Sequence, residues 1–295
     1  MRAWLIAVSL AVAVPAAAQD LDRDGLPDRL EQQLLDKFTP TLLLTHGECD
    51  GVPASFVPNV PEPQVLAKDA TLYGQAFSLS AADGRWQVEL HFFHLWSKDC
   101  GRLGHDLDVE HVSAIVSAPR IDTPAASWIA EAWYAAAHEG SACDASSGAP
   151  ARVLGAVTTG PRVFVSRGKH ASYFDRGQCK WGCGSDECGD DQRITPVAVI
   201  NIGELDAPLN GALWARSGRW PMAEKFGSDF EPALRARLDD SGGRHVIPLM
   251  QHLRGPQAPV LAGVTAIEGL VTATESATRA LGTAQRAVAG FIRRR

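Results

Sequence analysis

Six short apolar runs separated by turn-forming residues limit the folds open to this chain more than any other feature. The runs are rich in aliphatic and aromatic residues, and the second alternates with a period of two, as strands do. They read ATLYGQAFSLS, RWQVELHFFHLW, DVEHVSAIVSA, AASWIAEAWYAAAH, RVFVSRG and VAVINIG, with turn signals such as ADG and SSGAP between them. Strand–helix alternation does not repeat, which disfavours a parallel α/β sheet. We therefore expect a mostly β protein, an antiparallel β-sandwich over residues 39–255, with edge strands and loops in 39–63 and irregular structure from 204.

The first 18 residues have the layout of a secretory signal peptide. One Arg precedes an uninterrupted apolar stretch, and small residues ending in Ala16-Ala17-Ala18 predict cleavage after Ala18. Elsewhere, runs fall short of the roughly 18 apolar residues that a membrane helix needs. We therefore expect a mature protein that is secreted or periplasmic.

The net charge limits the expected binding partners, and the cysteines are considered together with export. The chain has 28 Lys and Arg against 34 Asp and Glu, and its one basic block is the terminal RRR, so nucleic acid is not an expected partner. Cysteines in an exported chain indicate disulfides rather than a thiolate zinc site, and six cysteines allow fifteen pairings among which the sequence does not choose. They are Cys49, Cys100, Cys143, Cys179, Cys183 and Cys188.

Residues 19–38 have the spacing of a calcium-binding loop followed by a helix. Carboxylates at alternate positions can surround the ion, Gly25 can make the sharp turn, and a helix should run from about Pro27 to Phe38. The expected ligands are Asp20, Asp22, Asp24, Leu26 through its carbonyl, Asp28 and Glu31. The alternative is that these acidic residues only cap and charge the start of the helix.

The C-terminal tail, residues 256–295, is rich in Ala and has an apolar stripe at helical spacing. We expect a helix docked on the body or on a partner; a helix lying on a membrane surface is the alternative.

The stretch GHDLDVEHV, residues 104–112, concentrates side chains of the metal-ligand type. On a strand, Asp108 and Glu110 face the same side and His111 faces the other. His105 lies just before the strand, and a hairpin would bring Asp99 back beside it. Oxygen-rich ligands with an imidazole suit Mg²⁺, Ca²⁺ or Mn²⁺, and the imidazole also admits Zn²⁺. The alternative is a solvated loop whose polar residues only cap the turn.

The sequence FFHLWSKDCGRLGHDLDVEHVSAIV resembles the metal-site region of the necrosis- and ethylene-inducing peptide-like proteins, and also that of related vacuolar-sorting-type proteins. In the family, an aromatic strand ends in Lys-Asp, and a short loop leads to Gly-His-Arg-His-Asp-Trp-Glu. Further along, AWYAAAHEG and RVFVSRGKHASYFD are similar to family segments that carry histidines. The resemblance spans residues 88–175.

The resemblance implies a metal site and a fold with peripheral helices around the sandwich. Position by position, the implied ligands are Asp99, His105, Asp108, Glu110 and His170. The chain departs from the heptapeptide at Asp106, Leu107 and Val109, and its loop after Asp99 is two residues shorter. Because the ligands match and their neighbours do not, the resemblance supports a metal site better than it supports the lysis of plant cells.

Three functions follow as hypotheses. The first is a divalent-metal-dependent protein that recognises a glycan or lipid headgroup, contacts a membrane peripherally and is in addition cytolytic, as toxic family members are. Trp181 could then stack on a sugar, or else only pack on disulfides. The second is a metal-dependent hydrolase with His138 as general acid or base, although we find no catalytic motif that supports it. The third is a calcium-stabilised structural or surface protein. We favour a binding protein over an enzyme, and the oligomeric state is left open.

Overall fold

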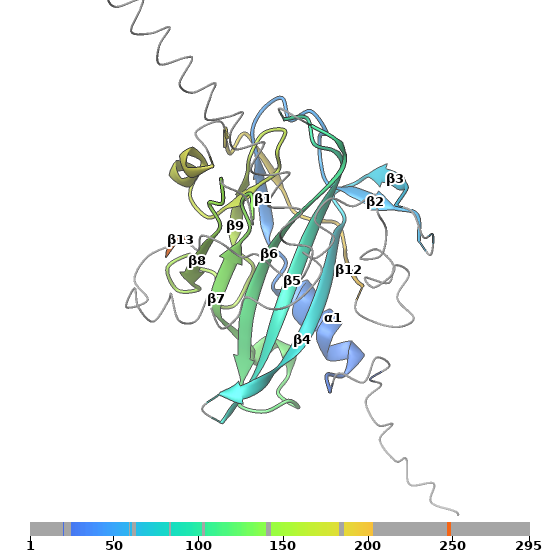
Figure 1. Cartoon of the computed structure of the whole chain (residues 1–295). Helices are drawn as coiled ribbons and strands as arrows, with labels where there is room; N and C mark the ends of the chain where they lie inside the picture. Colours follow the sequence, from blue (N-terminus) through green and yellow to red (C-terminus); the bar gives the residue numbers. More distant parts are fainter. Residues whose placement is uncertain are drawn as a thin grey trace, which may run out of the picture.

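The computed structural model of this 295-residue chain describes residues 20, 25–58, 60, 63–82, 84–101, 104–139, 143–182, 186–202 and 247–248. Within them, two main sheets enclose an apolar core, and a two-stranded ribbon and one α-helix lie at the side (Figure 1). The expected mostly β, sandwich-like architecture is confirmed.

A seven-stranded sheet forms the larger layer. Its order is β12 (Val199–Asn201), β4 (Leu72–Ala82), β5 (Arg85–Lys98), β6 (Asp106–Ala118), β7 (Ile129–Ala135), β8 (Ser147–Pro150) and β13 (Ile247–Pro248). Neighbouring strands are antiparallel except β12 and β4, which are parallel. β5 and β6 pair over nearly their whole length, with Trp96 opposite Asp108 and His94 opposite Glu110. The long hairpin therefore carries the two predicted carboxylates of β6 beside aromatic side chains of β5.

A four-stranded sheet forms the second layer, in the order β10 (Ser172–Tyr173), β9 (Arg162–Val165), β1 (Thr41–Leu44) and β11 (Gln192–Ile194). β1 lies between β9, to which it is parallel, and β11, to which it is antiparallel. The two-stranded ribbon consists of β2 (Ala54–Phe56) and β3 (Val65–Lys68). The expectation of edge strands in residues 39–63 was wrong for β1, because its Leu42 and Leu44 are buried and it has a partner on each side.

The main core fills the space between the two sheets. It joins Leu90 and Phe92 of β5 to Leu42 of β1 and Val163 of β9. The alternate residues of β5 and β6 enter a second apolar cluster, which includes Phe93, Leu95, Leu107 and Val109. β5 is therefore buried on both faces along its central part, although a period-two sequence usually indicates a strand with one solvated face.

The helix α1 (Asp28–Lys37) begins and ends within one residue of the predicted bounds. Leu30, Leu34 and Leu35 are buried on its inner face, which is the pattern of an amphipathic helix. It packs on β4 at Gly74, where an added Cβ would lie 2.7 Å from Leu35 Cδ2. At its C-terminal end, Lys37 Nζ donates to backbone carbonyl oxygens of the 3₁₀ helix η1 (Ala125–Ser127) and of Trp128.

One turn assignment needs correction, and several predictions fall outside the described residues. Ser147–Pro150, part of the predicted turn SSGAP, forms β8 and pairs with β7, because its small side chains fit a buried strand. The signal peptide, most of 204–255 and the tail 256–295 lie outside the described residues. In the part of the chain that is described, no helix is both long and apolar enough to cross a membrane.

Candidate metal centre and ligand site

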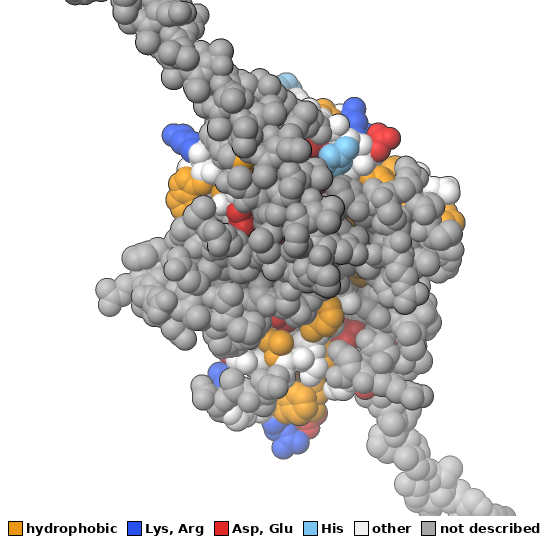
Figure 2. Space-filling model, viewed as in Figure 1, with side chains coloured by type: hydrophobic (Ala, Val, Ile, Leu, Met, Phe, Trp, Pro, Cys, Tyr) orange, Lys and Arg blue, Asp and Glu red, His pale blue; other side chains and the backbone are white. Residues whose placement is uncertain are grey.

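The predicted ligands come together at one end of the β5–β6 hairpin, at the top of the molecule in Figure 1. Here the chain leaves β5 at Lys98 and enters β6 at Asp106. The Asp99 N–H donates to the His105 carbonyl oxygen at 2.8 Å, and His105 Nε2 lies 3.8 Å from Asp99 Oδ2. The hairpin thus brings these two residues together as predicted. In the same view, Figure 2 shows histidine, basic and acidic side chains gathered at this end.

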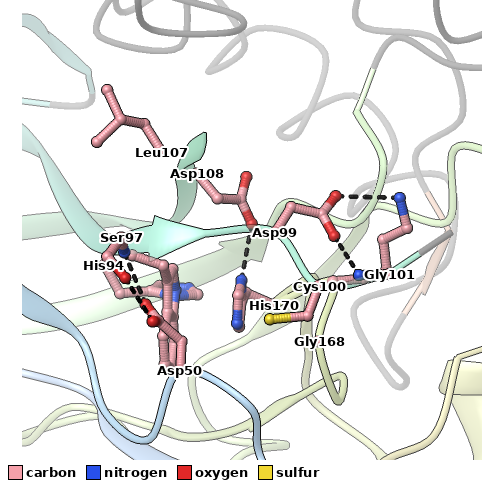
Figure 3. Close-up of polar contacts among 12 residues, drawn as sticks. Asp50, His94, Ser97, Asp99, Cys100, Gly101, Leu107, Asp108, Gly168 and His170 are labelled. Atoms are coloured by element: carbon pink, nitrogen blue, oxygen red, sulfur yellow. Dashed lines mark hydrogen bonds and ion pairs between the residues drawn. The ribbon is translucent and has the colours of Figure 1, made fainter. Parts of the chain in front are cut away.

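His170 joins the cluster from the loop between β9 and β10. Its Nδ1 lies 2.8 Å from Asp108 Oδ2 (Figure 3), and its ring stacks on Trp96 with a centroid distance of 3.9 Å. The side chain is fully buried. Burial alone would lower the pKa of His170, but the carboxylates of Asp108 and Glu48 outweigh it and raise the pKa to about 9.

Glu48 belongs to the same cluster, and the sequence reasoning missed it. Its Oε1 lies 3.3 Å from His170 Nε2, and its Oε2 accepts a hydrogen bond from the Gly168 N–H at 2.9 Å. Burial would raise the pKa of Glu48, but the hydrogen bond and charge of His170 hold it below its usual range. The Cys49–Cys100 disulfide ties Glu48 to the residue that follows Asp99. Knowledge of the Cys49–Cys100 pairing would have placed Glu48 near Asp99, but the sequence does not determine how the cysteines pair.

Asp99 is buried and faces charges of both signs. Its Oδ1 accepts from the Gly101 N–H at 2.6 Å (Figure 3), and its Oδ2 lies 3.0 Å from Lys169 Nζ. Burial raises the pKa of Asp99, and the negative charge of Asp108 raises it further. Such a pair of carboxylates is stabilised by a cation between or beside them.

Glu110 is buried on the same face of β6 as Asp108, and its negative charge acts on His138. His138 Nε2 is 2.8 Å from Asp186 Oδ2, which also accepts a hydrogen bond from the Tyr173 hydroxyl at 2.5 Å. Burial would lower the pKa of His138, but the charge and hydrogen bond of Asp186 raise it, with a smaller contribution from Glu110.

His138 and His170 both have left-handed backbone, with φ of 53° and 56°. Residues other than glycine seldom adopt this conformation, and it concentrates at functional sites. His111, by contrast, points to the opposite face of the sheet, as predicted, where its ring contacts His91 and Tyr134.

The predicted metal ligands lie at the same end of the hairpin, but their ligand atoms do not form one compact group. Among the described residues, one group places its ligand atoms within 4.8 Å of one another, Glu48 with Cys49 and His170, and Cys49 is disulfide-bonded. The carboxylates and imidazoles at this end of the hairpin nevertheless match in kind what Mg²⁺, Ca²⁺ or Mn²⁺ needs. The residues present therefore fit a divalent ion by their chemistry.

A surface hollow of about 540 Å³ lies beside this cluster, within the size range of small-ligand sites. The 3₁₀ helix η2 (Arg176–Trp181) forms part of it and ends at Trp181, whose side chain is 48% exposed. Thr45 Oγ1 is buried there and, within the described part of the chain, has no hydrogen-bond partner. The lining residues are Thr45, Arg176, Gly177, Cys179, Lys180, Asp186, Glu187 and Cys188.

The disulfides confirm the prediction for the described cysteines. Cys49 pairs with Cys100 and Cys179 with Cys188, and Cys143 is also disulfide-bonded. Cys183 lies outside the described residues. The Cys179–Cys188 bond closes the loop that bears Trp181 and Asp186.

The N-terminal calcium loop is described in part. Gly25 has φ of 93° and donates its N–H to Asp20 Oδ2 at 3.2 Å, as a turn at that loop position requires. Glu31 is buried and accepts a hydrogen bond from Asn201 Nδ2 at 2.8 Å, while Leu26 enters the core. Asp22 and Asp24 lie outside the described residues, so the calcium loop stays a prediction.

Together, the fold and the site define a two-layer β protein with a carboxylate–histidine cluster at the end of its central hairpin. Solved structures of necrosis- and ethylene-inducing-like proteins are similar to this chain. The structure titled NLPPya in complex with mannosamine is 17% identical and has a TM-score of 0.37; the match covers 77% of this chain and 95% of that one. Necrosis and Ethylene inducing Protein 2, from the causal agent of cocoa's witches' broom disease, is 16% identical with a TM-score of 0.38, over 72% and 90% of the two chains.

A third similar structure is titled non-toxic HaNLP3; it is 14% identical with a TM-score of 0.37, over 65% and 86% of the two chains. No family model and no curated protein sequence matches the chain.

Proposed function

We propose that this is an exported β-sandwich protein that binds a divalent cation at the end of the β5–β6 hairpin and uses it to recognise a glycan or lipid headgroup. Asp99, His105, Asp108 and Glu110 would hold the ion. The sequence also predicted His170 as a ligand, but a carboxylate lies at each of its ring nitrogens, so we assign His170 to orienting Asp108 instead. A bound Mg²⁺ or Ca²⁺ would supply a positive centre for the hydroxyl groups of a sugar.

One observation carries this proposal: buried carboxylates and imidazoles from segments far apart in the sequence lie at the same end of the β5–β6 hairpin. Glu48, the 99–110 hairpin, His138 and His170 all contribute to the cluster, and a disulfide and buried hydrogen bonds fix their positions. Buried carboxylates and imidazoles on left-handed backbone cost stability, so their assembly favours a functional site.

The hollow next to the cluster supports a ligand larger than an ion. Asp186 lines the hollow and pairs with His138, and the charge of Glu110 also acts on that histidine. Exposed Trp181, at the end of η2, offers a flat apolar surface for stacking on a sugar or for peripheral contact with a membrane.

The test compares the purified wild-type protein with Asp108→Ala. We expect the wild type to contain a divalent metal by mass spectrometry and to bind on a glycan array or to release dye from liposomes. We expect Asp108→Ala to lose the metal from this site and the binding while remaining folded. Asp122→Ala is the matched control, because that carboxylate is exposed and pairs with Arg120 beyond the other end of β6. Glycan binding without leakage would indicate a free sugar ligand rather than a membrane.

A wild-type protein that carries no divalent metal, and whose melting temperature does not respond to a chelator, would overturn the proposal. Loss of stability alone in Asp108→Ala, without any ligand bound by the wild type, would favour the structural alternative.

The His138–Asp186 pair favours a metal-dependent hydrolase as a second candidate. A histidine oriented by a buried carboxylate is the usual arrangement of a general acid or base. The raised pKa of His138 suits an acid better than a base at neutral pH. Turnover of an ester or glycoside substrate that disappears in His138→Gln, with metal content unchanged, would support this function over binding alone.

A further inference from the structure

Lys169 brings a fixed positive charge into the candidate metal centre. Its Nζ lies 3.0 Å from Asp99 Oδ2, and its side chain is 18% exposed. The next residue, His170, contacts Asp108. Two adjacent residues of one loop therefore each face one of the two carboxylates that the hairpin brings together.

The surroundings of Lys169 are shaped to hold its side chain in place. A Cβ at position 101 would overlap Cγ, Cδ and Cε of Lys169, so the aliphatic part of the lysine lies directly against Gly101. The Gly168 carbonyl oxygen accepts hydrogen bonds from the N–H groups of Cys100 and Gly101, at 2.8 and 3.1 Å. These bonds hold the backbone next to Lys169 against the backbone next to Asp99. Packing on Gly101 as well as charge therefore directs the ammonium group at Asp99.

The charges near the Lys169 ammonium group show which carboxylate it stabilises. The negative charge of Asp108 disfavours ionised Asp99, and Lys169 counteracts it. The ammonium group thus compensates the same buried carboxylate that a divalent ion would bind.

We propose that Lys169 is an internal cation that neutralises Asp99 in the metal-free protein, and that a divalent ion binds this carboxylate only by displacing the lysine ammonium group. The inference rests on the proposed metal site. The affinity for the divalent ion then depends on how strongly the Lys169 ammonium group competes with that ion for Asp99.

Isothermal titration of the full mature chain with Ca²⁺ and with Mg²⁺ tests the competition. Lys169→Met removes the charge and keeps an unbranched stem on Gly101, and we expect it to bind the ion at least about tenfold more tightly than the wild type. Every protein in the series carries Asp20→Ala with Asp24→Ala, so that the N-terminal loop does not add to the heat signal. Arg120→Met is the matched control: this exposed cation pairs with Asp122 beyond the other end of β6 and should leave the affinity unchanged.

Gly101→Ala tests the same inference without removing the lysine. The new methyl group should push the Lys169 side chain off Asp99, so this variant should also bind the divalent ion more tightly than the wild type. If Lys169→Met fails to fold, Gly101→Ala decides the question.

The titrations distinguish the role of Lys169 from the existence of the metal site. Equal affinity in the wild type and in both variants, or weaker binding in Lys169→Met, would overturn the role of Lys169 alone. Absence of divalent-ion binding in the wild type and in both variants would overturn the metal site itself, and with it this inference.

Discussion

His170 is held by contacts at both ring nitrogens and on one face of the ring. Asp108 and Glu48 lie at the nitrogens and Trp96 covers the face, while the backbone has a left-handed φ of 56°. The cost of the strained backbone is on the order of 1–3 kcal/mol. The two carboxylates offset it only while the ring is protonated, so stability should depend on pH.

We expect the stability of the metal-free wild type to decline between pH 6.5 and pH 9. The folded-state pKa of His170 is raised from 6.5 to about 9, so its contribution is fully present below pH 6.5 and is lost as the pH rises toward 9. The loss should be up to about 3 kcal/mol, from 1.36 kcal/mol per pKa unit. Thermal melts in a chelator across this range measure it. The control is His170→Asn, since Asn tolerates left-handed backbone; parallel slopes for the two proteins would contradict the prediction.

Asp50, next to the disulfide, should be more important for stability than an exposed carboxylate. It is buried, pairs with Lys68, and its Oδ2 accepts a hydrogen bond from the Ser97 N–H at 2.6 Å. Burial would raise the pKa of Asp50, but the donors on Lys68 and Ser97 hold it below its usual range. Asp50→Asn should lower the free energy of unfolding by about 1–3 kcal/mol, because charge-assisted bonds are lost.

Urea denaturation measures this change. The matched variant is Asp122→Asn. The Asp122 carboxylate pairs with Arg120 in solvent, so this variant should leave the free energy of unfolding nearly unchanged. A smaller loss of unfolding free energy in Asp50→Asn than in Asp122→Asn would contradict this prediction.

At the scale of elements, two disulfides connect the loops that form the candidate site. Cys49–Cys100 closes 51 residues and joins the segment after β1 to the end of β5, whereas Cys179–Cys188 closes 9 residues within one loop. Chain-entropy arguments assign more stabilisation to the longer closure.

Cys49→Ser with Cys100→Ser should therefore destabilise the protein by roughly 4 kcal/mol, against roughly 2.5 kcal/mol for Cys179→Ser with Cys188→Ser. The first pair should also weaken metal binding, because Glu48 and Asp99 flank the bond, and the second should affect only the Trp181 loop. Denaturant titration and metal analysis of both double variants test this order. Equal losses of metal would show that the Cys49–Cys100 bond has no specific part in the site.

For the whole molecule, we expect two independent contributions of divalent ions to stability. A chelator should lower the melting temperature of the wild type, because an ion that binds only the folded state stabilises it by about 2.7 kcal/mol at one hundred times its dissociation constant. Asp108→Ala should remove one part of the shift, and Asp20→Ala with Asp24→Ala the other. Calorimetry of the combined variant should give a chelator response near zero, since distant sites add.

A large response that persists in the combined variant would place a stabilising ion elsewhere. No response in the wild type would mean that neither predicted site holds an ion.

The sequence by itself determined α1 and most of the strands of the larger sheet. The calcium-loop spacing predicted the helix that follows it, α1, and the apolar runs predicted β4, β5, β6, β7, β9 and β12. Spacing alone placed Asp108 and Glu110 on one face and His111 on the other, and a hairpin was enough to bring Asp99 to His105. These are local properties, since periodicity and turn chemistry act over a few residues.

Only the tertiary structure decided which distant segments meet. It placed β1 beside β9, paired Cys49 with Cys100, brought Glu48 to His170, and set Lys169 against Asp99. It also made a buried strand from part of a predicted turn, Ser147–Pro150. Contacts of this kind depend on the burial of whole sheet faces and on backbone bonds between loops far apart in sequence. No local pattern records them, and for that reason the cation that faces Asp99 became visible only in the folded chain.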